Sequence, residues 1–378
     1  MGNSGSSFYY PLINARSNNP DYVNRCKEYI SKLDSNNVPV IFDMYHLSLL
    51  TKVSYSYIFS IIKRKYETYR VFYIKKRTGG KRRILAPQAQ LLTLQSWINN
   101  QILKNIDPHT CSQAYSKGSS IFKNASIHCR NNYLIKLDIE NFFENISERS
   151  VYKVFENTGY SPMVSFILSR ICTYPLSIKK KISSSKWSTN NSYKIKTTVI
   201  NEYGKAVIGS LIQGACTSPL LSNLCFKHID EEINRICSMH NCIYSRYSDD
   251  IFISSNYIDR NISLRIIRGV EKILNKNGFR SNKKKKRVLP NGAKKIITGL
   301  CINSGRPLAL NSIKQKIKNY GYYCDKFGPA NVCSKLGFKS IFGFKNHYLG
   351  LINYIKNTNN DFAEKMLKEF KTIKWPEI

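Results

Sequence analysis

The sequence is poor in acidic residues. Its 378 residues include 24 Asp and Glu against 59 Lys and Arg, which gives a formal net charge of +35 and an isoelectric point near 9.8. A cation excess of this size, spread over the whole chain, predicts a polyanionic partner bound along an extended surface. Nucleic acid is the first candidate for that partner, and an anionic membrane surface is the second.

Long apolar runs and paired cysteines are also missing. No stretch of about 18 apolar residues occurs, and residues 1–7 are not followed by the apolar segment of a signal peptide. The 11 cysteines are scattered and include no C-x-x-C pair, which argues against a disulfide framework and against a zinc site. We therefore expect a cytoplasmic protein with reduced thiols and without membrane contact.

Hydrophobic and aromatic residues are abundant, at 42% and 12% of the chain, so a folded protein is expected throughout. Tyr is unusually common, with 25 residues, and many lie beside Lys or Arg. Aromatic faces interleaved with cations suit base stacking combined with phosphate contact. An AT-rich genome would also enrich Tyr, Lys, Asn and Ile, but it does not account for the scarcity of acids.

Hydrophobic periodicity gives a coarse map of the chain. Residues 1–20 are polar and are expected to form a loosely held arm. Helices are predicted over 20–35, 43–50, 54–65, 88–103, 119–130, 151–175, 220–237, 264–277 and most of 311–378. Strands are predicted over 71–74, 82–85, 133–138 and 296–302, with a hairpin over 243–254. The polar, basic segment 177–200 is expected to be an inserted hairpin.

The hairpin over 243–254 carries two adjacent acids, Asp249 and Asp250, in a tight turn that begins at Ser248. Adjacent carboxylates repel each other unless a cation lies beside them. In a cleft the usual cation is Mg²⁺, which prefers carboxylate and phosphate oxygens. The alternative is that Asp favours turns and that the pair simply faces water.

A third acid, Asp138, ends the apolar strand over 133–138. Strand ends are common positions for functional carboxylates, because the rigid strand fixes them while leaving them accessible. Glu140 competes for this role, but it falls where the strand is expected to turn into a helix. A strand-end Asp followed by an Asp-Asp hairpin suits a site that brings three carboxylates around two Mg²⁺ ions.

Three other parts of the chain are candidates for substrate contacts or for structural roles. The segment 75–81, KKRTGGK, is a basic Gly-Gly turn that can close over a triphosphate or remain a solvated loop. Gly214 permits close approach of the backbone before a long helix. His128 and Asn124 lie one helical turn apart, although a lone histidine is more often structural.

Together these motifs resemble those of reverse transcriptases. Residues 247–250 (YSDD) are similar to Y-x-D-D, residues 138–143 (DIENFF) to D-x-x-x-x-F/Y, and residues 213–223 (QGACTSPLLSN) to Q-G-x-x-T-S-P-x-L-S-N. Residues 124–128 (NASIH) and 297–299 (ITG) resemble the N-A-x-x-H and V-T-G motifs of bacterial retron reverse transcriptases. The departures, at Ser248, Cys216, Ile297 and segment 177–200, remove no carboxylate.

The resemblance implies an α+β fold of the right-hand polymerase type. It comprises fingers, a palm whose antiparallel sheet carries the three Asp residues, and a helical thumb. The implied boundaries are 1–45 for an N-terminal arm and helix, 46–130 for fingers with the retron X region, 131–302 for the palm with its basic insertion 177–200, and 303–378 for the thumb and C-terminal RNA-binding region.

The resemblance also implies roles for single residues. Asp138, Asp249 and Asp250, with the Ile139 carbonyl, are expected to bind two Mg²⁺ ions. Contacts to the incoming nucleotide are implied for Lys76, Arg82, Phe143 as a steric gate against the ribose 2′-OH, Gln213 and Lys285. Primer and template contacts are implied for Tyr247 and Gly214, and recognition of RNA for Asn124, His128, Thr298 and Gly299.

For a bacterial retron reverse transcriptase, the implied activity is RNA-directed DNA synthesis from dNTPs on a cognate structured non-coding RNA. Priming from a guanosine 2′-OH would give branched RNA–DNA (msDNA), within an antiphage defence system that includes an effector protein. One alternative is a group II intron-like or diversity-generating reverse transcriptase, although no maturase or endonuclease segment is expected after residue 310. The other is a catalytically silent RNA-binding scaffold, against which the three intact acids argue.

Overall fold

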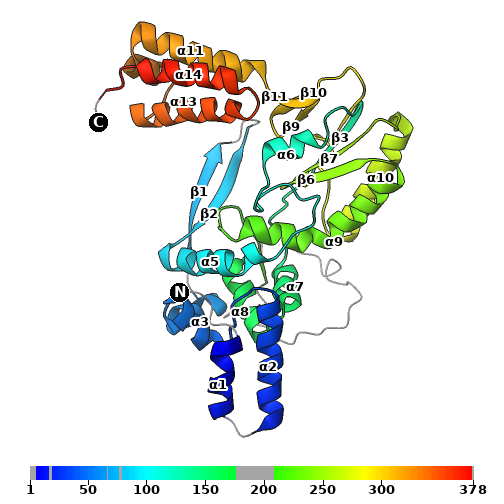
Figure 1. Ribbon diagram of the computed structural model, residues 1–378, viewed down its shortest axis with the longest axis vertical. Coiled ribbons are helices and arrows are strands. Elements are labelled where there is room, and N and C mark those ends of the chain that lie inside the picture. Colours follow the sequence, from blue (N-terminus) through cyan, green and yellow to red (C-terminus); the bar gives the residue numbers. More distant parts are fainter. Residues whose placement is uncertain (1–5, 17–18, 66, 76–78, 176–207, 377–378) are drawn as a thin grey trace.

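The computed structural model describes residues 6–16, 19–65, 67–75, 79–175 and 208–376. Lys76 and the predicted hairpin over 177–200 lie outside the described residues. Figure 1 shows an elongated molecule, with helices α1 (Ser6–Arg16) and α2 (Pro20–Ser35) at one end and a group of C-terminal helices at the other. In the described part of the chain, no helix is long and apolar enough to cross a membrane.

A four-stranded antiparallel sheet, the central sheet, lies between these ends. Its strand order is β6 (Ile243–Tyr247), β7 (Asp250–Ser255), β3 (Tyr133–Asp138) and β8 (Arg287–Leu289). The predicted strand over 133–138 and the hairpin over 243–254 are confirmed. Side chains alternate between the two faces, and the two faces belong to different hydrophobic clusters.

Helices cover one face of the central sheet. These are α7 (Glu148–Thr158), α8 (Pro162–Cys172), α9 (Ser218–Met239) and α10 (Arg260–Lys276), which share the main core with Ile135 and Ile251. The prediction of one helix over 151–175 is wrong. Gly159, with φ +113°, ends α7, and α8 begins at Pro162 behind the N-cap Ser161, because glycine stops a helix and proline suits a first turn.

The other face is partly covered by α6 (Ile121–Ser126) and by a small sheet of β9 (Ile296–Ile297), β10 (Leu300–Ser304) and β11 (Arg306–Ala309). Leu134 and Phe252 of the central sheet pack there against Ala125. The predicted single strand over 296–302 is wrong, because Thr298 and Gly299, with φ +46° and +88°, reverse the chain between β9 and β10.

The N-terminal part is helical. It contains α1, α2, α3 (Met44–Thr51), α4 (Tyr55–Ile62), α5 (Ala89–Gln101) and the 3₁₀ turn η1 (Leu103–Asn105). The expectation of a loose arm over 1–20 is wrong for Ser6–Arg16. Tyr9, Tyr10 and Ile13 of α1 pack against the main core, so three apolar side chains anchor a mostly polar segment.

An antiparallel ribbon of β1 (Tyr69–Lys75) and β2 (Lys81–Pro87) stands apart from the central sheet (Figure 1). It confirms the predicted pair of strands. Four consecutive apolar residues of β1, 71–74, are exposed. The ribbon is joined to the segment before α9 by a 2.9 Å hydrogen bond from the Leu85 N–H to the Gln213 carbonyl.

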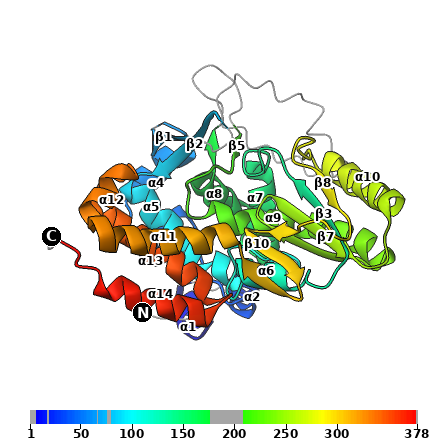
Figure 2. The ribbon, with the colours of Figure 1, turned by 90° about the horizontal axis from the view of Figure 1, so that it is seen from above.

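The C-terminal helices are α11 (Asn311–Phe327), α12 (Pro329–Lys335), α13 (Ile341–Lys356) and α14 (Asn360–Thr372). They form a hydrophobic cluster of their own around Phe344 and Tyr348. Figure 2 shows them on one side of the molecule, with the central sheet and α10 on the other. The short strands β4 (Tyr174–Pro175) and β5 (Gly209–Ser210) pair with each other.

Candidate active site

The acids Asp138 and Asp250 come from neighbouring antiparallel strands. The register pairs Asp138, the last residue of β3, directly with Asp250, the first residue of β7. Directly opposed residues of an antiparallel pair share one face of the sheet. Asp249 precedes Asp250, and its carbonyl accepts a 2.9 Å hydrogen bond from the Ile139 N–H. The fold therefore gathers the three predicted acids at one end of the central sheet.

The turn between β6 and β7 consists of Ser248 and Asp249. Ser248 has φ +60°, a left-handed conformation that costs a non-glycine residue roughly 1–2 kcal/mol. Its carbonyl accepts a 2.9 Å hydrogen bond from Nη1 of Arg246, and its Oγ accepts one of 2.8 Å from the Tyr115 hydroxyl. These two contacts hold the turn in its strained conformation.

A buried ion pair supports the turn from the side that faces the protein interior. The Arg246 side chain is fully buried, and its Nε and Nη2 lie 2.8 and 2.7 Å from the two carboxylate oxygens of Asp230 on α9. Nη1 also reaches Asn223 Oδ1 at 3.1 Å, and the guanidinium carbon lies 4.6 Å from the ring centre of Phe226. Burial lowers the pKa of Arg246, but Asp230 more than compensates, so the pKa lies above its ordinary value.

The motifs did not point to Arg246 or Asp230. The available signal was strand alternation, which places Arg246 on the same face of β6 as the buried Tyr244. An arginine on the inward face of a strand requires a buried acid. The chain supplies it 16 residues earlier, and the Tyr244 hydroxyl donates to the same carboxylate at 2.6 Å.

The electrostatics of the three acids favour a cation. Burial raises the pKa of Asp249, with a further rise from the charge of Asp138, while Lys285 and Arg82 act in the opposite direction. Burial likewise raises the pKa of Asp250, against the influence of Lys136. Crowded and partly desolvated carboxylates gain most from a positive ion placed between them.

Two lysines lie against these carboxylates. Lys285 Nζ is 2.7 Å from Asp138 Oδ1, and this bond raises the pKa of Lys285. Lys136 Nζ is 3.5 Å from Asp250 Oδ1 and 5.1 Å from the ring centre of Phe252. Lys285 was predicted as a nucleotide contact, whereas Lys136 was not predicted. It lies two residues before Asp138 on β3, so alternation alone places it on the same face.

In this conformation, no three Asp, Glu, His or Cys side chains of the described residues are gathered closely enough to hold a metal ion. The donor set nevertheless suits a hard divalent cation, because all three side chains are carboxylates. The Ile139 N–H donates to the Asp249 carbonyl. The bonds from Glu140 N to Arg280 O and from Asn282 N to Asp138 O join the chain on either side of Ile139 to residues 280–282.

Among the residues predicted to contact the nucleotide, Lys285 and Arg82 act electrostatically on the acids at this end of the central sheet. Arg82 is exposed on β2, and its positive charge acts to lower the pKa of Asp249, against the larger effect of burial. Phe143 is partly buried and packs edge-on against Phe142 at 5.5 Å. Gln213 is also partly buried. Glu140, which was considered less suitable than Asp138 as the functional strand-end acid, follows the end of β3 and is exposed.

Gly214 lies where the segment before α9 meets the β1–β2 ribbon. Its φ is +117°, and a Cβ at this position would lie 2.4 Å from the Leu85 carbonyl oxygen and 2.9 Å from a methyl carbon of Ile84. No other residue type fits without moving β2. The glycine predicted from the motif is therefore required by a close contact within the protein.

Asn124 and His128, which were predicted to serve RNA recognition, are fully buried. His128 Nε2 lies 2.7 Å from Ser245 Oγ on β6, and Nδ1 lies 2.7 Å from Ser254 Oγ on β7. Asn124 Oδ1 accepts a 2.7 Å hydrogen bond from the Ser245 hydroxyl. Burial lowers the pKa of His128 to about 3. The pair attaches α6 to both strands of the hairpin.

Thr298 and Gly299 connect this layer to the C-terminal helices. Thr298 Oγ1 donates to the Ile121 carbonyl of α6 at 3.2 Å, and the Gly299 carbonyl accepts from the Tyr354 hydroxyl of α13 at 3.2 Å. Gly299 is exposed and Thr298 is partly buried. Of the four residues predicted for RNA recognition, these two lie nearer the surface.

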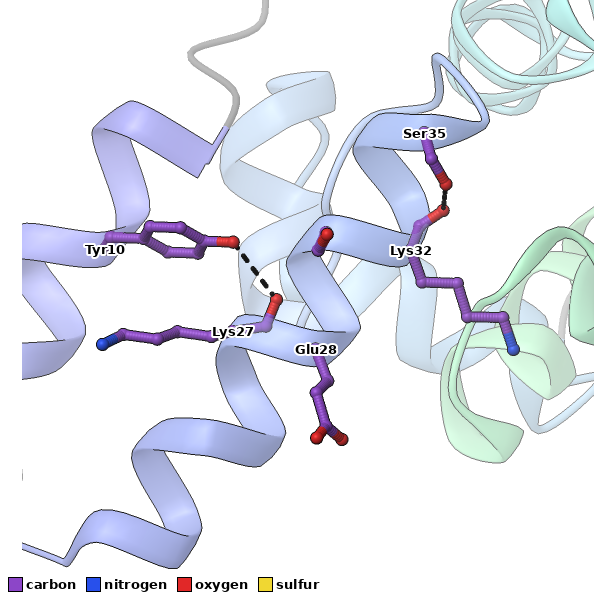
Figure 3. Close-up of a pocket in the computed structure, with 6 residues that line it drawn as sticks. Tyr10, Lys27, Glu28, Lys32 and Ser35 are labelled. Carbon is purple, nitrogen blue, oxygen red and sulfur yellow. Dashed lines mark hydrogen bonds between the residues drawn. The ribbon is translucent and has the colours of Figure 1, made fainter.

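Two hollows lie away from the acids. One, of about 500 Å³, lies between α1 and α2, where the Tyr10 hydroxyl donates to the Lys27 carbonyl (Figure 3). Its other lining residues include Glu28, Lys32 and Ser35, and they form no acid–base or metal-binding arrangement. The second, of about 730 Å³, lies on the C-terminal helices and includes Tyr323.

Comparison with known proteins shows to which family this chain belongs. A family model described as "Reverse transcriptase (RNA-dependent DNA polymerase)" matches residues 74–323, which is more than half of the chain. The chain belongs to the reverse transcriptase family. Its fold is accordingly the mixed helix-and-sheet, right-hand polymerase fold.

Individual relatives indicate which type of reverse transcriptase this chain is. The retron Ec86 reverse transcriptase of Escherichia coli is 25% identical over 91% of this chain and 99% of its own. The retron Ec83 reverse transcriptase of Escherichia coli is 27% identical over 81% and 88%, and the retron Se72 enzyme of Salmonella heidelberg is 29% identical over 71% and 64%. The protein is thus a retron-type reverse transcriptase, an RNA-directed DNA polymerase, as the motifs predicted.

Among solved structures, the telomerase of Candida albicans in complex with a fragment of telomeric RNA aligns with 87% of this chain and 68% of its own. The TM-score is 0.40 and the identity is 14%, so this likeness carries no argument about function.

Proposed function

We propose that this retron-type reverse transcriptase copies a cognate structured non-coding RNA into DNA. In this proposal, synthesis is primed from a guanosine 2′-OH and leaves branched RNA–DNA (msDNA). The observation that carries the proposal is the pairing of Asp138 with Asp250 on adjacent strands, with Asp249 in the turn beside them. The retron relatives support a dedicated RNA, and the charge of +35 supports tight binding of it.

Asp138, Asp249 and Asp250, with the Ile139 carbonyl, would hold two Mg²⁺ ions. When bound, such ions activate the primer hydroxyl and stabilise the pyrophosphate oxygens during in-line displacement. The protein contributes fixed carboxylates, because strand pairing and the Arg246-supported turn set their positions. Lys285 holds its proton firmly beside Asp138 and would donate it to the leaving pyrophosphate.

The remaining predicted residues would form the pocket for the dNTP. Phe143 would exclude a ribose 2′-OH, and Gln213 would line the pocket. Arg82 on the exposed ribbon would neutralise the triphosphate, together with Lys76, which lies outside the described residues. Lys136, on the same sheet face as Asp138, would contact a phosphate of the primer strand.

Primer and template would lie across the end of the central sheet. Tyr247 would contact the primer end, and Gly214, fixed against β2, would lie under the nascent base pair. Asn124 and His128 would act indirectly, by holding α6 on the hairpin. Thr298 and Gly299 would bring the RNA-binding surface of the C-terminal helices to the site.

We further propose that residues 46–130 act as fingers, 131–302 as the palm and 303–378 as an RNA-binding thumb, with 1–45 packed against the fingers. The hollow on the C-terminal helices combines Lys316 with Tyr320 and Tyr323, a mixture that suits RNA. The setting would be the bacterial cytoplasm, in a defence system against phage with an effector protein.

The decisive experiment is to sequence the nucleic acid that co-purifies with the protein, before and after treatment with a debranching enzyme. Short DNA joined to a defined RNA through a 2′-linked guanosine is expected from the wild type. Asp249→Asn removes one charge at constant shape, and it should abolish the DNA while the RNA still co-purifies. Undiminished DNA in this variant would contradict the proposal, as would unbranched DNA primed elsewhere.

A further inference from the structure

We propose that Tyr115 is a second aromatic contact for the primer strand, beside Tyr247, at the nucleotide that carries the reactive hydroxyl. This inference rests on the proposed function, because it takes the Asp hairpin (residues 243–255) as the polymerase site. The site would accept the sugar and base of a nucleic-acid strand end. None of the motifs includes Tyr115.

The backbone before Tyr115 runs beside the catalytic hairpin. Arg246 N donates to the Cys111 carbonyl at 2.9 Å, and Gln113 N donates to the Arg246 carbonyl at 2.8 Å, so this segment forms a parallel bridge along the outer edge of β6. Tyr115 follows two residues after Gln113. Because the segment runs parallel to β6, Tyr115 lies beside the turn that carries Asp249.

Contacts fix the tyrosine at that level. Its hydroxyl donates to Ser248 Oγ at 2.8 Å, and its ring centre lies 6.5 Å from that of Tyr247 at an angle of 44°. The negative charge of Asp249 also acts on Tyr115, since it contributes to the raised pKa of the phenol after the larger contribution of burial. The ring is thus adjacent to the turn that bears two of the three acids.

The conformation of Tyr115 is strained. Its φ is +67°, a region that a bulky side chain occupies only where its surroundings impose it. Here the preceding residue, Ala114, is fully buried, and its carbonyl accepts a 2.7 Å hydrogen bond from Asn223 Nδ2. The chain is held on one side of Tyr115 and on the other by the bond to Ser248.

Core packing does not explain this strain. The side chain of Tyr115 remains 42% exposed, so the hydrophobic core gains little from it. The Ser248 carbonyl already has a buried partner in Arg246. What the strained conformation achieves is the presentation of an aromatic face next to Tyr247, at the end of the central sheet where the acids meet.

The chemistry of the surrounding surface favours nucleic acid as the occupant. Lys117 is exposed two residues later, and Gly118, with φ +75°, has no atom within 4 Å of the position of a Cβ, so the backbone there is open to approach. An aromatic face with a cation two residues away fits a sugar or base followed by its phosphate. Stacking of this kind strengthens binding about 5- to 150-fold per base.

Photocrosslinking gives a direct test. The wild-type enzyme is incubated with an RNA template annealed to a DNA primer that ends in 4-thiothymidine, irradiated and digested with trypsin. We expect the crosslink on the peptide 105–117, NIDPHTCSQAYSK, at Tyr115. A crosslink found only on peptides that lack residues 111–117 would overturn the inference.

Variants add a kinetic test. Tyr115→Ala is expected to raise the Kd for the primer–template about 5- to 150-fold, the range that corresponds to about 1–3 kcal/mol, with a smaller change in the KM for dNTP. Tyr115→Phe keeps the ring, so it should retain most of the affinity. Tyr257→Ala is the matched control, since Tyr257 is 77% exposed and follows the opposite end of β7. Thermal unfolding of each variant separates lost folding from lost binding.

The two proposals fail in different ways. A wild-type enzyme that extends no primer and yields no DNA would contradict the proposed function. An active wild type whose affinity for the primer–template is unchanged in Tyr115→Ala would contradict only the role of Tyr115. If Tyr115→Phe and Tyr115→Ala lost the same amount of affinity for the primer–template and no crosslink formed, the only role of Tyr115 would be to hold Ser248. That result would also overturn the inference.

Discussion

Lys285 Nζ lies 2.7 Å from Oδ1 of Asp138, one of the three acids at the end of the central sheet. The lysine is 58% exposed, so it can leave the carboxylate without disturbing the core. In the absence of ions, its ammonium group neutralises part of the charge that the three acids concentrate. Under the proposed function, Lys285 would compete with the metal ions for the carboxylate of Asp138.

Removing this lysine should strengthen metal binding and weaken catalysis. Lys285→Gln is expected to bind Mn²⁺ several-fold more tightly in nucleic-acid-free protein, measured by calorimetry, because the carboxylate loses a competing cation. Nucleotide incorporation by the same variant should fall at least tenfold, since the pyrophosphate loses its proton donor. Lys284→Gln, with the same change of charge at an exposed neighbour, should alter neither quantity. Weaker Mn²⁺ binding by Lys285→Gln would contradict the competition.

The buried pair of Arg246 and Asp230 should show strong coupling in stability. Arg246→Met and Asp230→Leu each leave one buried charge without its partner and should each lower the free energy of unfolding by about 3–5 kcal/mol. The double variant should lose much less than the sum, as measured by urea unfolding. Additive losses would show that the two side chains act independently.

A surface ion pair provides the control for these measurements on the buried pair. Lys276 Nζ lies 3.5 Å from Glu232, with 70% of the lysine side chain exposed. Glu232→Gln should change stability by less than about 1 kcal/mol. DNA synthesis should be retained by this variant and lost in Arg246→Met, whose catalytic turn has lost its support.

Gly214→Ala tests the joint between β2 and the segment before α9. The added methyl would meet the Leu85 carbonyl at 2.4 Å, so we expect a destabilisation above about 2 kcal/mol and a marked loss of nucleotide incorporation. Gly278→Ala is the matched control, because Gly278 also has positive φ but has open space around it. Equal effects of the two substitutions would show that backbone conformation, and not the contact, determines the cost.

His128 should make the protein less stable in mild acid. Burial lowers its folded-state pKa to about 3 from an unfolded value near 6.5, so between these values the unfolded chain binds a proton that the folded protein does not. Stability is therefore expected to fall as the pH decreases from about 6.5, by up to about 1.4 kcal/mol per pH unit. The groups that contact the ring, Ser245, Ser254 and Phe252, do not titrate in this range.

Chemical unfolding at pH 7.0, 6.0 and 5.0 measures this slope. His128→Gln should lose it, whereas His228→Gln, at an exposed position, should keep it. A slope that persists unchanged in His128→Gln would assign the acid sensitivity to other groups.

The sequence predicted the parts of this fold that depend on short-range patterns. The strand over 133–138, the hairpin with Asp249 and Asp250 and the helix after Pro219 all carry strong local signals, and each was confirmed. One error concerned the polar segment 1–20, where side chains of α1 pack against the main core. The other two arose where one or two residues interrupt a periodic stretch. Gly159 divides one expected helix, and the Thr298–Gly299 turn divides one expected strand.

Other features depend on long-range contacts that no local pattern reveals. Arg246 lies within the hairpin motif, but its partner Asp230 is recognisable only when β6 packs on α9. The burial of His128 follows from two serines more than a hundred residues away. Tyr115 is exposed and belongs to no motif, so only its strained backbone and its contact with Ser248 distinguish it.

The position of β3 in the central sheet has a consequence for protein synthesis. β3 lies between β7 and β8, and both of these strands follow it by more than a hundred residues. At about 5–20 residues per second, the ribosome needs on the order of ten seconds to supply them after it has made Asp138. Until then Asp138 has neither its strand partners nor the other two acids. The nascent chain therefore cannot assemble its three acids before the hairpin of β6 and β7 has left the ribosome.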